Sequence, residues 1–185
     1  MCKRFLGIGF GLLFLVLSVG ITSAQTTPFI AVYFDRSFQV EAQDPCPGFG
    51  VLDTLYIELV NADAFVSGVE FKVEYPPVLG WLADFDQQPA TIGTTPTGFS
   101  MGWAIPQNGL SSAVDICKVL VQWTCEGCPG PFEIKVVPNP FTSFLGYTDF
   151  PDYNLLPAVG MTSLICPTIP TQETTWGKVK SLYGE

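Results

Sequence analysis

The 185-residue sequence contains no histidine. Without an imidazole, a serine or cysteine cannot form the usual histidine-dependent catalytic site, and zinc cannot be held by histidine. The sequence also lacks a glycine-rich phosphate loop ending in Lys and Ser or Thr, and it has no dinucleotide-binding fingerprint. These absences exclude the commonest catalytic classes, and we expect a protein that is not an enzyme and needs no cofactor.

Positive charge is also scarce. The chain has 8 Lys and Arg against 17 Asp and Glu, which gives a net charge of −9. Nucleic acids attract clustered Lys and Arg because each phosphate carries a negative charge. A nucleic-acid partner is therefore excluded, and an extracellular protein or a glycan is the expected partner.

The first residues have the features of a signal peptide. Lys3 and Arg4 precede an apolar run at residues 5–19, and Thr22 and Ala24 suit a cleavage site after Ala24. The run is shorter than the roughly 20 residues of a membrane span, although an uncleaved anchor remains the alternative. We expect residues 1–24 to be removed, which leaves 161 residues, a net charge of −11 and no transmembrane segment. The mature protein should be secreted or at the cell surface, with the periplasm as the alternative.

Cysteine usage agrees with export. Cys2 leaves with the signal peptide, and the five cysteines of the mature chain are Cys46, Cys117, Cys125, Cys128 and Cys166. All five are disulfide candidates in an oxidising compartment. An odd number predicts two disulfides and one free thiol, whose identities the spacing does not assign. For "CEGC" a structural disulfide is favoured over a metal site or a redox site, because structural zinc needs a second pair of ligands.

Alternating apolar and polar residues predict short β-strands. In "VSGVEFKVEYPP", Val69, Phe71 and Val73 point one way, while Glu70 and Lys72 point the other. We expect strands at residues 29–34, 51–60, 66–75, 98–104, 113–124, 131–138 and 159–166. The pattern predicts an all-β protein, an antiparallel β-sandwich of roughly seven to nine strands.

The remaining segments predict connections and a division into parts. Residues 87–97 should form a long loop and residues 139–157 an irregular crossing, while "CEGC" should lie at the tip of a hairpin between 113–124 and 131–138. The expected parts are the signal peptide (1–24), a sandwich domain (25–166), a Pro/Thr spacer (167–175) and an amphipathic tail (176–185).

Acidic and aromatic residues supply the remaining candidate sites. The acidic pairs are Asp84 with Asp86 and Asp149 with Asp152. Each pair is interpreted as part of a solvated loop, with a calcium site as the alternative and a glycoside-hydrolysing carboxylate pair as a minor one. The aromatic candidates for stacking on a partner are Trp81, Trp103, Tyr147 and Tyr153. Packing in the core or at a sheet edge is the alternative for these four.

One stretch carries a family resemblance. "VSGVEFKVEYPPVLGWLADF" resembles the early strand pair of cohesin-type and related carbohydrate-binding β-sandwiches, and "SFLGYTDFPDYNLLPAVGMTSLIC" is similar to the cohesin ending. The resemblance implies a cohesin- or immunoglobulin-like sandwich in a secreted bacterial protein. It also implies a non-catalytic binding or adhesion module for a protein or glycan. The alternative function is a structural subunit that self-assembles at the cell surface or in a filament.

The tail is a separate feature. "TTWGKVKSLYGE" is similar to T-W-G-x-[VI]-K-x-L-Y endings of diverse secreted bacterial proteins. In a helix, Trp176, Val179 and Tyr183 share a face with Leu182 beside them. Such a short helix is not stable alone in water. We expect it to dock on its own sandwich, to be recognised by other machinery or to remain disordered.

Overall fold

The structure is a computed structural model that describes residues 27–35, 42–43, 47–86, 88, 90–126 and 130–166. The signal peptide, the spacer and the tail lie outside these residues, as do Cys46 and Cys128. Over the described ranges the chain forms thirteen strands and no helix. None of its elements is therefore a helix able to cross a membrane.

The strands vary widely in length, from two residues to eleven. In chain order they are β1 (Phe29–Tyr33), β2 (Ala42–Gln43), β3 (Leu52–Val60), β4 (Phe65–Glu74), β5 (Leu79–Phe85), β6 (Ala90–Thr94), β7 (Gly98–Asn108), β8 (Val114–Trp123), β9 (Phe132–Val137), β10 (Gly146–Phe150), β11 (Leu155–Pro157), β12 (Val159–Gly160) and β13 (Thr162–Ile165).

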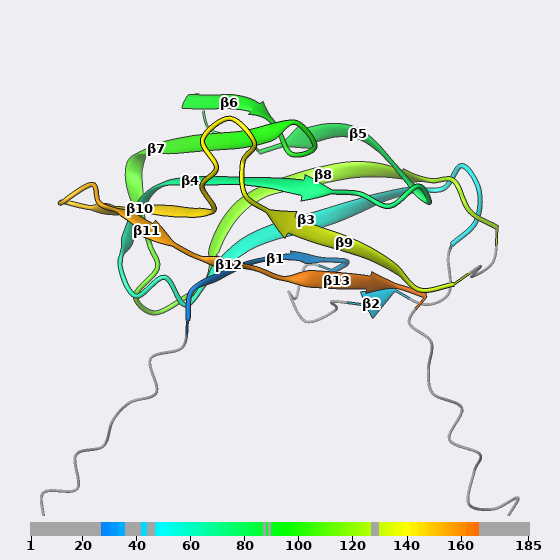
Figure 1. The fold of residues 1–185 in the computed structure, drawn as a ribbon, viewed down its shortest axis with the longest axis horizontal. Coiled ribbons are helices and arrows are strands. Elements are labelled where there is room, and N and C mark those ends of the chain that lie inside the picture. The colour runs from blue at the N-terminus through cyan, green and yellow to red at the C-terminus, as the bar shows by residue number, and fades with distance from the viewer. Residues whose placement is uncertain are drawn as a thin grey trace, which may run out of the picture.

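These strands form two packed sheets (Figure 1). The smaller sheet has the order β12-β1-β3-β8-β5. The larger sheet runs β11-β10-β4-β9-β13-β2, and β7 and β6 extend it on the other side of β4. The expected all-β sandwich is confirmed.

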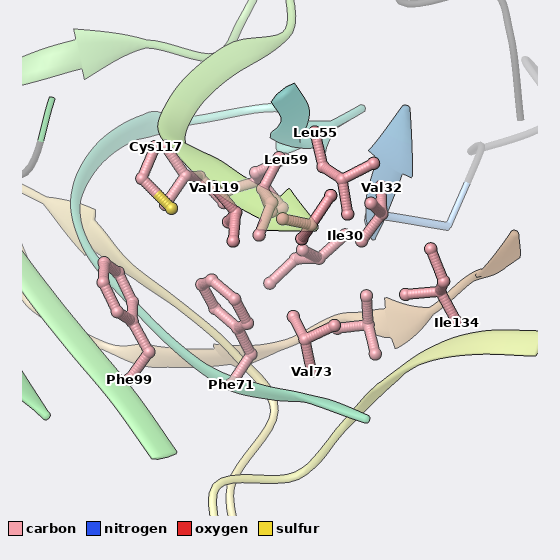
Figure 2. Packing of buried hydrophobic residues seen from close by; sticks show 14 of the residues in the cluster. Ile30, Val32, Leu55, Leu59, Phe71, Val73, Phe99, Cys117, Val119 and Ile134 are labelled. Carbon is pink, nitrogen blue, oxygen red and sulfur yellow. The ribbon is translucent and has the colours of Figure 1, made fainter. Parts of the chain in front are cut away.

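The core lies between the two sheets and follows the sequence alternation. Phe71 and Val73 of β4 are buried against Leu55 of β3 and Val119 of β8, as Figure 2 shows. The rings of Phe71 and Phe99 pack with their centroids 5.0 Å apart. Burying a side chain of this size contributes about 1.5–3 kcal/mol of hydrophobic stabilisation. Apolar burial from both sheets therefore holds the sandwich together.

The expected hairpin around "CEGC" is wrong. β8 pairs with β3 and β5 in the smaller sheet, whereas β9 pairs with β4 and β13 in the larger one. The connection that contains Cys125 therefore crosses from one sheet to the other. Both strands have alternating patterns, but alternation fixes only which face of a strand is buried and does not select its partner.

Two segments expected to be irregular contain strands instead. Within residues 87–97, β6 pairs with β7 along its whole length, and the turn between the two strands lies at residues 95–97, where the Thr97 N–H donates to the Thr94 carbonyl at 3.1 Å. Within residues 139–157, β10 and β11 form an antiparallel pair. β6 and β11 are edge strands, each held by a single neighbour in the described part of the chain, so their side chains need no apolar alternation, whereas β10 lies between β4 and β11.

The last strand is split in two. β12 pairs in parallel with β1 in the smaller sheet, and β13 pairs with β9 in the larger one. Between them, the Met161 N–H donates to Ile30 and the Met161 carbonyl accepts from Val136. This crossing joins the two sheets at the end of the domain. With the short strands at the edges, it raises the strand number above the expected seven to nine.

Candidate binding face

The outward face of the larger sheet carries two rows of residues that cross five strands. Residues directly opposite one another in neighbouring strands point to the same face. The first row, from β6 through β7, β4 and β10 to β11, is Ile92, Ser100, Glu70, Gly146 and Pro157. The second row is Ala90, Gly102, Gly68, Thr148 and Leu155. The exposed side chain of Ile92 (78% exposed) shows that the rows face outward.

These rows form the floor of a shallow depression of about 390 Å³, which we call the trough. The second row has almost no side chains at its centre, where Gly68 and Gly102 lie opposite each other. A Cβ added at Gly102 would have its nearest neighbours at 3.7 and 3.8 Å, which are ordinary contact distances, so a side chain fits at this position without a clash. The floor therefore exposes backbone to an incoming partner.

One wall of the trough is the turn at residues 139–144. The Asn139 N–H donates to the Phe144 carbonyl at 2.8 Å, and the two residues form an isolated β-bridge. The ring of Phe144 lies over Gly146, where an added Cβ would come within 2.7 Å of the ring. Phe141, at the tip of the turn, is 81% exposed. In Figure 1 this turn is the yellow loop that rises beside β6 and β7.

A buried amide fixes this wall to the floor. Asn139 is 2% exposed, and its Nδ2 donates to Glu70 Oε1 at 3.3 Å and to Ser100 Oγ at 3.1 Å. The Ser100 hydroxyl also donates to Glu70 Oε1 at 2.8 Å. On its other side, Asn139 Oδ1 accepts from the N–H of Phe141 at 3.0 Å. Every polar atom of the amide thus has a partner, which makes the wall rigid.

Among the described residues that line the trough, Glu70 is the only charged one. Its carboxylate faces outward between residues with small side chains, and the described part of the lining contains no Lys or Arg. A cation on a partner would gain a charge-assisted hydrogen bond there without meeting a competing positive charge.

The opposite wall is the hairpin of β10 and β11. Tyr153 (63% exposed) lies in the trough lining, and its ring contacts Phe150 edge to face at 5.7 Å. The hairpin is closed by Asp149, whose carboxylate accepts from the backbone and side-chain nitrogens of Asn154 at 2.6 and 3.2 Å. Two apolar walls therefore flank a floor with few side chains.

The aromatic candidates divide between two places. Trp103, Tyr147 and Tyr153 all border the trough, although Trp103 and Tyr147 are nearly buried. The hydroxyl of Tyr147 donates to the Ala62 carbonyl, and burial raises the pKa of Tyr147. Trp81 lies in β5 of the smaller sheet, where its Nε1 donates to Asp84 at 2.9 Å.

The acidic candidates take part in separate interactions. Asp84 lies in β5 and not in a loop, and its carboxylate accepts from the N–H and hydroxyl of Thr95 at 2.8 and 2.7 Å. Asp86 forms an ion pair with Lys118. Asp152 is exposed beyond β10. No group of three metal-ligating side chains occurs among the described residues.

The cysteines that the structure describes also differ from one another. Cys125 and Cys166 are disulfide-bonded, whereas Cys117 is a buried free thiol that faces the core (Figure 2). Burial raises the pKa of the Cys117 thiol, and nearby Asp84 and Asp86 raise it further. A buried protonated thiol of this kind acts as a small apolar side chain.

Glu58 is a buried acid of the smaller sheet, away from the trough, that the sequence pattern did not single out. It lies opposite Asp115 across β3 and β8, next to an irregularity in the pairing, and it is 4% exposed. Burial, a hydrogen bond with Asp115 and repulsion from that carboxylate raise the pKa of Glu58 to about 8. In the sequence Glu58 occupies an ordinary outward position of an alternating strand, so no local signal distinguishes it.

The fold is shared with known structures. The chain superimposes on the cohesin CaCohA2 of Clostridium acetobutylicum, in a complex with a variant of CaDoc0917, with a TM-score of 0.53 at 10% identity. The match covers 77% of this chain and 100% of that one. The protein is a cohesin-like β-sandwich. The expected family resemblance is thereby confirmed at the level of fold.

Two further structures resemble this cohesin-like sandwich at a TM-score of 0.47. A non-cellulosomal cohesin of Archaeoglobus fulgidus is 15% identical, with 82% of this chain and 98% of that chain covered. A type III cohesin module of the ScaE cell-surface anchoring scaffoldin of Ruminococcus flavefaciens is 12% identical, with 81% and 92% covered. No protein-family model and no curated protein matches the sequence.

Proposed function

We propose that this cohesin-like sandwich is a secreted, non-catalytic module that binds an extracellular protein through the trough. The observation that carries the proposal is the trough itself, whose floor at Gly102 has no side chain and lies between two apolar walls. Exposed apolar patches of this kind mark protein-binding surfaces. The fold supports the same class of function, because the CaCohA2 structure is a complex with a second protein, the CaDoc0917 variant.

A protein partner is favoured over a glycan by the placement of the aromatic residues. A sugar platform needs several exposed rings in a row on one face. Of the four candidates, Trp103 and Tyr147 are nearly buried and Trp81 lies in the other sheet, which leaves Tyr153 as the exposed ring at the trough. The exposed side chains of Ile92 and Phe141 instead suit apolar contacts with a protein.

The geometry also predicts the chemistry of the partner surface. Its centre should be apolar enough to cover Ile92 and Phe141, and it should place one Lys or Arg against Glu70. The acidic chain would also attract a basic partner over longer distances, an effect that salt screens. Secretion follows from the predicted signal peptide at residues 1–24.

A side chain placed in the trough tests the proposal. Gly102→Glu adds a charged side chain to an open position of the floor and should abolish partner binding. Gly80→Glu is the matched control, because Gly80 lies in the other sheet and its added Cβ would also have neighbours at 3.6 Å or more. Immobilised wild type and both variants are exposed to secreted proteins of the source organism and to purified dockerin modules. Captured proteins are then titrated by calorimetry.

Binding by wild type and Gly80→Glu, together with its loss in Gly102→Glu, would support the trough as the binding surface. Equal binding by all three chains would place the partner elsewhere and contradict the proposal. A glycan array run with the same chains covers the other partner class, and glycan binding that Gly102→Glu abolishes would replace the protein partner with a sugar.

Self-assembly is the second candidate function, and strand β6 favours it. Among the described strands, β6 (Ala90–Thr94) pairs only with β7; it contains no charged residue and no proline, and it carries the exposed Ile92. Uncharged edge strands are templates for pairing with another chain. If this edge joins copies, sedimentation velocity will show a concentration-dependent oligomer that Ile92→Lys disrupts. A monomer at all concentrations would contradict this second function.

A further inference from the structure

We propose that the C-terminal tail, residues 176–185, docks in the trough of its own chain and competes there with the partner. The tail and the trough are complementary in character. The tail has an apolar set, Trp176, Val179, Leu182 and Tyr183, and two cations, Lys178 and Lys180. The trough has two apolar walls and a single charged residue, the anion Glu70.

The position of the chain where the described part ends makes this contact reachable. Cys166 directly follows Ile165, which lies opposite Phe132 of β9, and Lys135 of β9 lies opposite Glu74 of β4. Through these two pairings, Cys166 aligns with residue 78, eight positions after Glu70 in the direction of β4. β13 also lies two strands away from β4, because β9 is between them. At about 3.3 Å per residue and 4.8 Å per strand, the separation between Cys166 and Glu70 is about 28 Å.

The spacer has the matching length. Trp176 follows Cys166 by ten positions, and the sequence between them, "PTIPTQETT", is rich in Pro and Thr. An extended Pro-rich spacer rises about 3.1 Å per residue, so these ten steps span about 31 Å. The tail would therefore begin at the trough and not at the end of β13.

A depression that lies nearer to Cys166 than the trough does is a poorer match for the tail. A hollow of about 380 Å³ lies beside the end of β13, lined by Tyr75, Phe132 and Glu133 among others. Both acids of this hollow are already paired, Glu133 with Lys135 at 2.6 Å and Glu74 with Lys72 at 3.4 Å, so neither is free for a tail lysine. An extended spacer would also carry the tail past this hollow.

Docking would make the tail an intramolecular competitor. A short linker holds a tethered segment at an effective concentration of about millimolar. Such a segment excludes weak partners and yields to tight ones. This competition rests on the proposed function of the trough, whereas the docking contact itself does not.

Zero-length carbodiimide cross-linking of the chain from Gln25 to Glu185 tests the contact without any partner. The reaction joins a lysine amine and a carboxylate that already touch. We expect amide links from Lys178 or Lys180 to Glu70 in the monomer band, several-fold more abundant than links to Glu74 or Glu133. Trypsin digestion and tandem mass spectrometry identify the linked residues. Trp176→Ala, which removes the largest apolar contact but neither lysine, should reduce the Glu70 link several-fold.

Other distributions of links would overturn the inference. A freely moving tail would link mainly to Glu133 and Glu74, the exposed acids nearest its root, and Trp176→Ala would change nothing. Links to Glu70 found only in a covalent dimer would assign the trough to the tail of a second copy. Neither result affects the outcome of the partner-binding test with Gly102→Glu, so the tail proposal and the proposed function can be rejected independently. Glu70→Gln confirms the assignment, because the glutamine cannot form the link.

Discussion

The side-chain amide of Asn139 donates to the carboxylate of Glu70 at 3.3 Å and thereby ties a surface turn to the middle of a sheet. The two residues are 69 positions apart in the chain. Because Asn139 is almost fully buried, its hydrogen bonds are made away from competing water. The floor and one wall of the trough are therefore a single rigid unit before any partner arrives.

Replacing Asn139 should destabilise the domain and loosen this wall. Asn139→Ala removes the donor to Glu70 and Ser100 and leaves the N–H of Phe141 without its acceptor. The loss of buried hydrogen bonds predicts a decrease of about 1–3 kcal/mol in the free energy of unfolding. Urea denaturation measures this decrease, and hydrogen exchange at residues 139–144 should become faster.

Asn108→Ala is the matched control for Asn139→Ala. Asn108 also accepts from a backbone N–H, that of Leu110 at 3.1 Å, but it is exposed at the end of β7. Exposed hydrogen bonds contribute less because water replaces them, so the control should lose well under half as much stability. Equal losses in the two variants would show that the buried network has no special role.

Deprotonation of Glu58 should make the domain less stable as the pH rises. The pKa of Glu58 is about 8 in the folded protein and 4.5 ordinarily, so the folded state binds more protons between these values. Stability therefore falls from about pH 5 to about pH 8 and levels off above that. Because the chain has no histidine, little else titrates between about pH 6 and 8. Thermal unfolding across this range measures the effect.

Glu58→Gln should remove this dependence. The amide is neutral at every pH, so the variant should keep its melting temperature between about pH 6 and 8 and exceed the wild type at about pH 8. Glu133→Gln, at an exposed position of β9, should retain the wild-type slope. A slope that persists in Glu58→Gln would assign the pH dependence to another group.

The disulfide pairing can be predicted from the strand register. β2 and β13 run parallel, with Gln43 opposite Ile165, and in the sequence Cys46 follows β2 by three positions and Cys166 follows β13 directly, so we predict that these two cysteines pair. Cys125 and Cys128 are then left to form a disulfide within "CEGC". Non-reducing trypsin digestion should link the peptide of residues 37–72 to that of residues 136–178, and residues 119–135 should contain an internal bond.

Cys117 provides the control within the same digest. Its thiol is free and buried, so iodoacetamide should modify it only after denaturation. Labelling of Cys117 in the native protein would contradict its burial, and a disulfide on the peptide of residues 73–118 would contradict the predicted pairing. A link between residues 37–72 and 119–135 would reverse the predicted pairs.

The strands that form the centres of the two sheets were predictable because their patterns are local. β3, β8 and β9 lie within expected segments, β4 begins one residue before its segment, and β7 extends four residues beyond its own. The edge strands β5, β6 and β11 were not, since an edge strand has one neighbour and needs no buried face of its own. The hairpin expected around "CEGC" was wrong for a related reason. The residue pattern of a strand does not determine which neighbouring strand it pairs with.

The candidate site was partly visible in the sequence. Tyr147 and Tyr153 were singled out by composition, and both border the trough. Gly68 and Gly102, which make its floor, look like ordinary interruptions of alternating strands in the sequence. Their role arises only when β4 and β7 pair and the two glycines lie opposite each other. The role of Asn139 likewise depends on Glu70 and Ser100, which come from two other strands.

The sequence by itself determined the class of this protein. Its alternation requires strands with one buried face, and its lack of histidine and its negative charge predict a non-catalytic protein without a nucleic-acid partner. The tertiary structure decided strand pairing, the crossing at Met161, the state of Cys117 and Glu58, and the shape of the trough. The physical reason is the distance along the chain over which each effect acts. Alternation and composition act along the chain, whereas pairing, burial and pKa depend on groups that meet only after folding.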